Sequence, residues 1–222
     1  MSDYSAIATA TAVIREILRE SQSVLDGGSV DVSTSTPATV LKNLTKDNDI
    51  LNLFLYQVTP NIAYRNADLP TIHQNGNRML SKPLLALDLH YLLSAASTHE
   101  LKAQLMLSSA MIALHENAII PKRKIKETID TIAQLKPEGE EFIAASNLAS
   151  QTESLKISLE SLSIEELTKL WSTFAQTEYH LSAAYHVSVL LLESTKKPET
   201  SKQVDKRILH INPLQQKPPT KK

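Results

Sequence analysis

The chain has 222 residues, of which 42% are hydrophobic and 21% charged, as expected for one soluble globular domain with or without a tail. It contains no cysteine, which excludes disulfides, thiolate metal sites and a cysteine nucleophile, and its four glycines exclude the usual Gly-rich phosphate loops. No apolar run reaches the roughly 18–20 residues that cross a bilayer. The first residues also lack the pattern of a secretory signal peptide, which predicts synthesis in the cytoplasm.

The charge is distributed unevenly along the chain. Residues 195–222 carry eight basic and two acidic side chains, whereas the preceding residues carry 15 basic and 22 acidic ones. Proline and the absence of hydrophobic periodicity favour an extended tail over 195–222. We therefore predict a folded body, 1–194, and a basic tail able to attract an acidic protein surface, a nucleic acid or an anionic membrane.

The first half of the chain alternates helical and strand patterns. Residues 5–25 have apolar positions at helical spacing, and their balanced polar face favours packing on a core over binding a membrane surface. Residues 30–32 fit a short strand. Strands are predicted at 50–58 and 83–95, and a polar loop of about twenty residues, 61–82, joins them.

The strand at 50–58 is apolar on both faces, which is typical of a central strand. Strict alternation predicts which side chains share a face. Leu51, Leu53 and Leu55 point one way, and Phe54, Tyr56 and Val58 point the other way.

A helix is predicted over 98–115. Ser97 and Glu100 have the spacing of a capping box at its start. Its apolar residues extend around more than one side, which predicts that the helix is covered on more than one side. The stripe consists of Leu101, Leu105, Ser108 and Ile112, and it is widened by Leu107, Met111 and Leu114.

The next segments are shorter. Pro121 begins a helix that Pro137 ends, and 138–152 fits either helix or loop. Alternation over 155–159 predicts a half-exposed strand. The Ser-x-x-Glu pattern at 163–166 is a second capping box and opens a helix.

The last apolar segment, 179–193, is long for a strand, so we expect it to bend or to extend beyond the edge of the domain. Extra strand length favours pairing across a subunit boundary. The order of elements predicts an α+β fold, with a mainly antiparallel or mixed sheet covered by helices.

The residues show no catalytic constellation. Asp88 and His90 share one face of a strand, and so do His180 and His186 if their strand is straight. We interpret both pairs as polar positions on partly exposed strands. There is no Gly-x-Ser-x-Gly elbow and no His-x-x-x-His spacing, and the acidic cluster 138–141 fits a solvated loop. No cofactor or metal is predicted.

Nucleic-acid binding also lacks support. The tail has no interleaved aromatic residues, and the basic cluster 122–126 fits a solvated helix turn. The unusual features are surfaces: the loop 61–82, the long final strand and the basic tail. These are features of a component of an assembly.

Four segments in order carry a family resemblance: Leu55–Asn61 continuing through Tyr64–Pro70, Pro83–Leu93, Leu162–Ser172 and Tyr179–Ser194. Together they resemble the N-terminal domain of the cap, or tail-terminator, proteins of extracellular contractile injection systems. The Photorhabdus virulence cassette and the antifeeding prophage are of this type. The likeness covers roughly residues 5–195.

The resemblance implies a phage tail-terminator-like fold and a structural, non-enzymatic role. Members of this family close the end of the particle that is distal to the baseplate. Such a cap would be a homohexameric ring that stops growth of the inner tube and anchors the last sheath layer. The implied partners are other copies of the chain, the inner tube protein and the sheath protein, with no nucleic acid and no membrane insertion. Assembly would occur in the bacterial cytoplasm, and the cap can leave the cell with the particle.

The resemblance places interface residues in the matching loop, and the charge pattern adds others in the tail. In the alternative interpretation, Asn61 and Asp68 form turns and Arg65 pairs with Asp68 inside one subunit. Trp171 and Tyr185 are expected in the core. The predicted interface residues are Asn61, Tyr64, Arg65, Asn66, Asp68 and Leu69, with Lys196, Lys197, Lys202, Lys206 and Arg207.

The chain departs from longer relatives, which carry an additional C-terminal domain where this chain has its basic tail. That difference puts sheath anchoring by an extra domain in doubt. Two other hypotheses stay open: an adaptor that binds cargo or a second cap protein in such a system, and a small hydrolase or metal enzyme. Neighbouring sheath and tube genes favour the first two roles, whereas convergent metal ligands favour the third.

Overall fold

The computed structural model describes five stretches of the chain, and all of them belong to one unit, formed by Met1–Leu69 and Lys82–Lys196. A second unit, Pro70–Ser81 with Lys197–Lys222, lies outside the described residues, as does the predicted start of the tail at residue 195. The described stretches are 4–23, 30–44, 48–64, 84–174 and 177–193.

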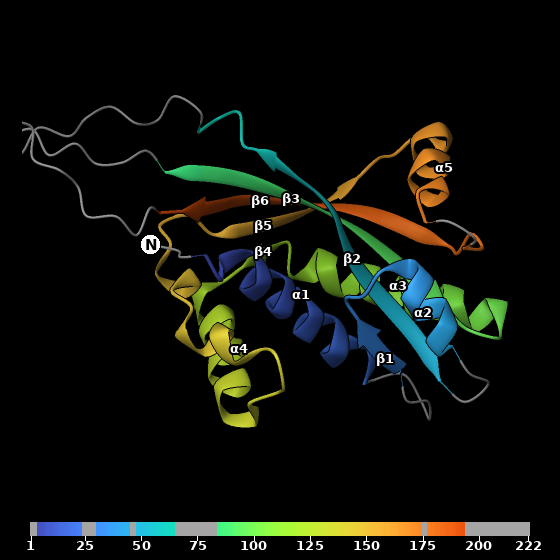
Figure 1. The fold of residues 1–222 in the computed structure, drawn as a ribbon, viewed down its shortest axis with the longest axis horizontal. Coiled ribbons are helices and arrows are strands. Elements are labelled where there is room, and N and C mark those ends of the chain that lie inside the picture. Colours follow the sequence, from blue (N-terminus) through green and yellow to red (C-terminus); the bar gives the residue numbers. More distant parts are fainter. Residues whose placement is uncertain (1–3, 24–29, 45–47, 65–83, 175–176, 194–222) are drawn as a thin grey trace, which may run out of the picture. The chain divides into compact units, whose positions relative to one another are not determined.

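The described elements alternate between helix and strand, in the arrangement of Figure 1. Two short 3-10 helices, η1 and η2, accompany them. In chain order the elements are α1 (Ala6–Gln22), β1 (Val30–Ser33), α2 (Pro37–Asn43), β2 (Asp49–Pro60), β3 (Leu85–Ala96), α3 (Glu100–Glu116), β4 (Ile119–Ile120), α4 (Lys122–Leu135), η1 (Glu141–Ala145), η2 (Leu148–Ser150), β5 (Leu155–Glu160), α5 (Ile164–Ser172) and β6 (Ser182–Leu192).

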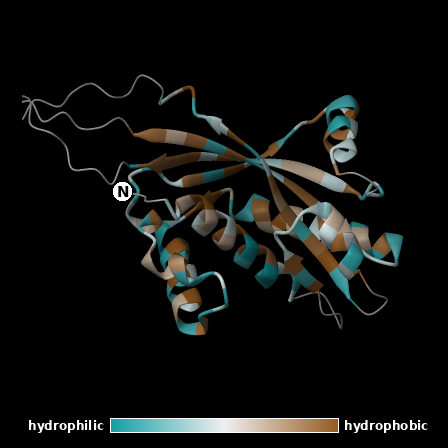
Figure 2. Cartoon of the chain, in the orientation of Figure 1, coloured by the Kyte–Doolittle hydropathy of each residue, from teal (hydrophilic) through white to brown (hydrophobic). Residues whose placement is uncertain are grey.

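The strands form one sheet in the order β1-β2-β3-β6-β5-β4. Strand β1 pairs with β2 in parallel, and all other pairs are antiparallel. Helices α1, α3 and α4 supply the side chains that bury one face of this sheet, which we call the helical face. Figure 2 shows that the long strands are mostly apolar, whereas α5 is largely polar. The mixed sheet and its helices confirm the predicted α+β class.

Helix α1 confirms the amphipathic helix predicted at 5–25, and its apolar stripe lies in the core. Val13, Ile14 and Leu18 are each at most 1% exposed. Thr11 reaches the sheet, because its Oγ1 lies 2.8 Å from the hydroxyl of the buried Tyr91. Packing against the sheet therefore accounts for the apolar side of this helix.

Strand β2 lies between β1 and β3, as the apolar pattern of both its faces predicts. The predicted alternation holds at Leu51 and Leu53, which are buried under the helices. It fails beyond Leu55, because a β-bulge at Tyr56 shifts the register. An extra residue in one strand reverses the faces that follow. Val58 therefore pairs with Leu89 on the helical face, not on the face predicted for it.

Helix α3 corrects two predictions. The helix begins at Glu100, with His99 as N-cap and no side-chain cap. Ser97 does not cap it, because its Oγ accepts a hydrogen bond from the His99 N–H at 3.0 Å. The three aliphatic side chains of the predicted stripe are more than half exposed, whereas Leu107 and Leu114, predicted to widen it, are buried. The core-facing residues are instead Met106, Leu107, Ala110, Ala113 and Leu114.

The elements that follow α3 match the prediction more closely. Helix α4 buries Ile125, Ile129 and Ile132. The ambiguous stretch 138–152 contains η1 and η2. The capping box that opens α5 is confirmed, because the Ser163 side chain accepts from the Glu166 N–H and the Glu166 side chain accepts from the Ser163 N–H.

Helix α2 was not predicted. It lies in a polar stretch and begins at Pro37, where a fixed φ suits the first turn of a helix. Val40 packs on Ile50 and Ala96, on the face of the sheet opposite α1. We call this face, which carries only small helices, the open face. One buried contact fixes this short helix, so hydrophobic periodicity gave no signal for it.

Strand β6 is shorter than the predicted segment, because it begins at Ser182. It pairs with β3 along its whole length, from Ser182 to Leu192. On its other side β5 ends its pairing at Ser188. Beyond that point Gln151 takes the place of a strand: its Nε2 donates to the Val189 carbonyl at 2.8 Å, and its Oε1 accepts from the Leu191 N–H at 2.9 Å. Within the described residues β6 is therefore engaged inside the chain, and pairing across a subunit boundary stays a prediction.

Candidate interaction surface

Asn61 closes the turn that leads out of β2. Its backbone N–H donates to the Ala86 carbonyl at 2.9 Å, and its side-chain oxygen accepts from the Tyr64 N–H at 3.2 Å. Its Nδ2 donates to both carboxylate oxygens of Asp88, at 2.8 and 3.1 Å. These bonds lie inside one chain, as the turn-forming alternative for Asn61 predicts, and they fix where the loop leaves the sheet.

Tyr64 is held by the same end of the sheet. Its ring packs against a small apolar cluster on the open face, formed by Ala86, Val189 and Leu191. A hydrogen bond to the carboxylate of Glu153 raises the pKa of the Tyr64 hydroxyl. Tyr64 thus anchors the first turn of the predicted interface loop to β3 and β6.

The remaining predicted interface residues lie outside the described residues, so the structure gives no geometry for them. In the loop these are Arg65, Asn66, Asp68 and Leu69, and in the tail Lys196, Lys197, Lys202, Lys206 and Arg207. The two predicted interface residues that are described, Asn61 and Tyr64, mark the point from which the loop starts.

A polar network covers the open face beside this turn. His90 lies at its centre: its Nδ1 is 3.0 Å from Oε2 of Glu160, and its Nε2 is 3.0 Å from the Thr59 hydroxyl. The Tyr56 hydroxyl donates to the same Glu160 oxygen at 3.2 Å. Burial and the Glu160 carboxylate raise the pKa of Tyr56, so this phenol stays a hydrogen-bond donor.

A second histidine joins the network from β6. His186 is the cross-strand partner of His90, and their ring centroids are 5.1 Å apart. Its Nε2 lies 3.5 Å from Asp88, which is also held by Asn61. The network therefore links four adjacent strands and connects directly to the turn at Asn61.

The sequence located only part of this network. Alternation placed Asp88 and His90 on one face, and the structure confirms that. His180 does not join His186, because it precedes β6 and lies beside Trp171, with ring centroids 6.1 Å apart. Thr59 was missed because the bulge at Tyr56 moves it to the open face.

Trp171 and Tyr185 are 6% and 5% exposed, which confirms both as core residues.

The polar network consists of histidine, carboxylate and hydroxyl groups that bond to one another. Each described histidine of the network is hydrogen-bonded or ion-paired: His90 bridges the Thr59 hydroxyl and the Glu160 carboxylate, and His186 pairs with Asp88. Among the described residues, no three His, Asp or Glu side chains are grouped to hold a metal ion. No helix within the described ranges is long and apolar enough to span a membrane.

Comparison with known proteins identifies the family of this chain. A family model described as the Pvc16 N-terminal domain matches residues 9–206. This chain belongs to the Pvc16 N-terminal domain family. The match spans every described element except the first residues of α1, so it includes the turn at Asn61 and the polar network.

Two solved structures resemble this Pvc16 N-terminal domain. The PVC sheath/tube terminator of an extracellular contractile injection system, in its extended state, has 13% identity and a TM-score of 0.55 over 93% of this chain and 63% of its own. The tube-terminating cap of the anti-feeding prophage has 14% identity and a TM-score of 0.54 over 91% of this chain and 60% of its own. No curated protein matches the sequence.

This Pvc16 N-terminal domain chain therefore spans somewhat under two thirds of the length of the solved structures that it matches. At 13% and 14% identity, the likeness establishes a shared fold. The tail-terminator-like fold expected from the resemblance is confirmed.

Proposed function

We propose that this chain is a structural cap that closes the baseplate-distal end of a contractile injection particle. In this role it ends growth of the inner tube and anchors the last sheath layer, without catalysing a reaction. One observation supports the proposal most strongly. The two solved structures, a sheath/tube terminator and a tube-terminating cap, each match more than nine tenths of this chain. The polar network on the open face offers hydrogen-bonding groups for a contact with another protein, which agrees with this role.

The partners follow from the role. Copies of the chain form a ring, which would be six-fold to match hexameric layers of tube and sheath, and the ring contacts the tube protein and the sheath protein. Assembly takes place in the bacterial cytoplasm, without nucleic acid or membrane insertion. Closed rings of identical subunits use head-to-tail contacts, in which two different surfaces of the chain meet.

Particle length tests the proposal. Cells that lack this chain are expected to make sheathed particles of abnormal length or none, seen by negative-stain electron microscopy. Supplying the chain should restore normal particles. Particles of normal length with normal ends in the deletion strain would contradict the cap role and would favour an adaptor that binds cargo or a second cap protein.

The loop 61–69 contributes to the interface in this proposal, and a test needs a substitution that spares the bonds of Asn61 within the chain. Asn61 holds Ala86 and Asp88 inside the chain, so substituting it would disturb the fold as well as any contact. Arg65→Glu is the sharper probe. We expect it to abolish rescue of particle length in the deletion strain, because a reversed charge opposes the contact. Circular dichroism and thermal unfolding should stay unchanged.

The matched control is Arg65→Lys, because this substitution keeps the positive charge. Rescue of particle length by Arg65→Lys but not by Arg65→Glu would support the loop as an interface. Equal rescue by both variants would remove Arg65 from it.

The basic tail is the second proposed contact, lying along a neighbouring cap subunit or an acidic sheath surface. Deleting residues 196–222 should weaken attachment to the particle, most strongly at low salt, and leave the body folded. A variant with glutamine at Lys196, Lys197, Lys202, Lys206 and Arg207 separates charge from chain length. Unchanged attachment of the truncated chain at physiological salt would contradict this contact.

A further inference from the structure

Part of the sheet is left uncovered by both of its outer strands. Strand β1 pairs with β2 as far as Asn52, and β4 pairs with β5 as far as Lys156 (Figure 1). Between these limits the cross-strand pairs line up in rows across β2, β3, β6 and β5, which we call the uncovered rows. They are Phe54 with Leu92, Ala184 and Glu160; Leu55 with Tyr91, Tyr185 and Leu159; Gln57 with His90, His186 and Ser158; and Val58 with Leu89, Val187 and Ile157.

The outer edge of β5 offers backbone groups to an added strand. Ile157 donates its N–H to the Ala118 carbonyl at 2.8 Å, on the side away from β6. In an antiparallel strand the N–H and C=O of every second residue point to the same side, so those of Leu159 face this edge as well. Strand β4 pairs there only with Leu155 and Lys156, and no other described strand lies beyond β5. Leu159 therefore has a backbone donor and a backbone acceptor directed at this edge.

The outer edge of β2 offers the matching groups. Ala95 of β3 donates its N–H to the Leu181 carbonyl at 3.3 Å, just before β6. The same alternation directs the backbone groups of Tyr91, four residues earlier, toward β6. Its partner Leu55 consequently directs its N–H and C=O away from β3, to an edge where the pairing with β1 ends at Asn52. Both ends of this uncovered row thus present backbone hydrogen-bonding groups.

These edges lack the charges that usually protect a free strand edge. Natural sheets commonly place lysine on such an edge or cover it with a helix. Residues 50–59 of β2 contain no charged side chain, and the bulge at Tyr56 leaves Val58 in register with β3. In β5 the charged residue of 157–160 is Glu160, whose carboxylate is already hydrogen-bonded inside the chain. An edge of this kind indicates that another strand covers it in the assembled protein.

The directions of the strands favour a second copy of this chain as the partner. Strands β2 and β5 run antiparallel to each other, because three antiparallel pairings separate them. Copies related by rotation about an axis along the strands keep these directions and keep the helical face on one side. The β2 edge of one copy then meets the β5 edge of the next in the antiparallel sense that the sheet already uses. In such a pair, Leu55 faces Leu159 of the next copy and exchanges both backbone hydrogen bonds with it.

The outer strands leave room for this pairing. On β2, β1 lies beyond the row of Phe54, and on β5, β4 lies beyond the row of Ile157. These are opposite ends of the uncovered rows. Strands β1 and β4 would therefore bracket the added strand from its two ends and fix its register.

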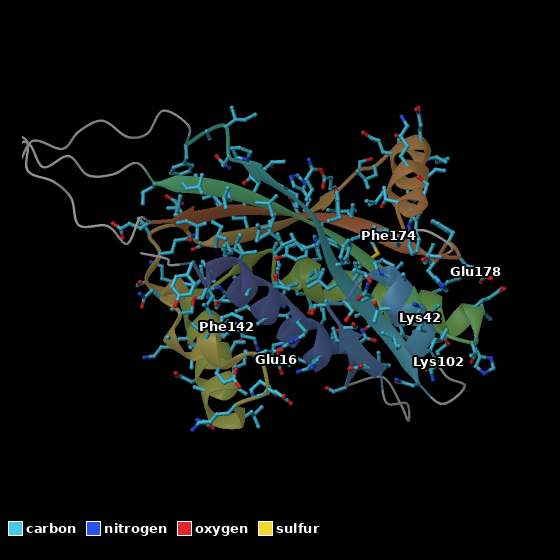
Figure 3. The ribbon with its side chains drawn as sticks, in the orientation of Figure 1. Glu16, Lys42, Lys102, Phe142, Phe174 and Glu178 are labelled. Carbon is cyan, nitrogen blue, oxygen red and sulfur yellow. The ribbon has the colours of Figure 1, made fainter. Side chains whose placement is uncertain are left out.

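The helical face beside each edge is apolar. Leu159 is 61% exposed and lines a hollow of about 570 Å³ with Ile112 and Tyr185. Leu55 lines a hollow of about 430 Å³ with Phe142, which Figure 3 shows beside α1. Pairing of the edges would place Leu55 next to Leu159 and cover both hollows. A strand of an unrelated protein covers one edge, whereas a repeated contact between copies covers both and leaves neither free in a closed ring.

We propose that the β2 edge of one copy pairs with the β5 edge of the next and joins the sheets of adjacent subunits. This inference rests on the proposed ring-forming function and deepens it by naming the strands that meet. Two different edges take part, so the contact is head-to-tail, and contacts of this kind close rings.

Cysteine pairing tests this contact in the full-length chain, which contains no cysteine of its own. Gln57 and Ser158 are exposed and end the same uncovered row, where the proposed contact makes them a non-hydrogen-bonded pair with close side chains. Inside one chain they lie three strand spacings apart, about 14 Å, too far for a disulfide. Oxidising a mixture of Gln57→Cys and Ser158→Cys should therefore give a disulfide-linked dimer on a non-reducing gel.

Further variants separate the contact from chance collisions. A chain with both cysteines should give a ladder of linked species that stops at the number of subunits in the ring. Gln134→Cys, exposed on α4, takes the place of either cysteine in control mixtures and should give little linked dimer. Leu159→Asp added to Ser158→Cys should lower the yield about 10-fold or more. Leu135→Asp, also an exposed leucine, should leave the yield unchanged.

Three results would overturn the contact: a mixture of Gln57→Cys and Ser158→Cys that links no better than the controls at the highest soluble concentration, Ser158→Cys alone that links to itself as well as the mixture does, or Leu159→Asp that links like Leu135→Asp. The second result would show that two β5 edges pair around a two-fold axis. Particle length in the deletion strain reports the cap role separately. Failed linking with abnormal particles would therefore reject these two edges and leave the cap proposal standing.

Discussion

Gln151→Leu is expected to lower the free energy of unfolding by roughly 3–5 kcal/mol. Gln151 is 2% exposed, and its amide bonds the Val189 carbonyl and the Leu191 N–H, where β6 has no strand on that side. Leucine has a similar volume but no amide. It would leave two buried backbone groups without partners, and each such group costs about 1–3 kcal/mol.

Urea denaturation of the full chain measures this effect. Gln134→Leu is the matched control, because Gln134 is exposed on α4 and the same exchange there should change stability by less than about 0.5 kcal/mol. A loss of stability for Gln151→Leu no larger than for the control would show that water or a shifted backbone replaces the amide. The C-terminal half of β6 would then not depend on Gln151.

Glu140→Gln is expected to destabilise the chain by about 2–3 kcal/mol at neutral pH. Glu140 accepts two hydrogen bonds from Arg15, at 2.5 and 2.7 Å, and thereby ties η1 to α1. Arg15 is only 12% exposed, so the neutral amide leaves a charged guanidinium that is poorly compensated. Glu141→Gln, one residue further on and exposed, is the control and should have little effect.

The same pair predicts a pH dependence. Hydrogen bonds from Arg15, more than its charge, lower the pKa of Glu140 below the ordinary value of about 4.3. A carboxylate with a lowered pKa in the folded state adds stability above its unfolded pKa, and that stability is lost as pH falls through the folded pKa. The gap between wild type and Glu140→Gln should therefore be full near pH 7 and shrink below about pH 4. A gap that is constant from pH 7 to pH 3 would contradict the charged pair.

Most of the fold could be predicted from the sequence, because the hydrophobic period of a long segment indicates whether it is a helix or a strand. The stripe of α1, the alternation of β3 and the capping box of α5 depend on neighbours within a few residues. Helix α2 was missed because a short polar segment, held by one buried contact at Val40, carries no period. The bulge at Tyr56 was missed because an extra residue in a strand leaves no mark in the hydrophobic pattern.

The surfaces were harder to predict than the core. The apolar residues of α3 could be assigned to the helix, but the pattern did not tell which side faces the core: Leu107 and Leu114 are buried, whereas the stripe that includes Leu101 is exposed. The polar network needed the register of four strands, because Thr59 and Glu160 reach His90 from different strands. The first turn of the loop, at Asn61, had both a turn-forming and an interface interpretation, and its bonds inside the chain support the first.

The most direct test of the cap role is to locate this chain on intact particles. Cryo-electron microscopy of particles that carry a compact tag on this chain would show where it lies. We expect density for one ring at the baseplate-distal end of each particle, above the last layers of tube and sheath. Density at the baseplate, along the whole sheath, or nowhere on purified particles would contradict the account.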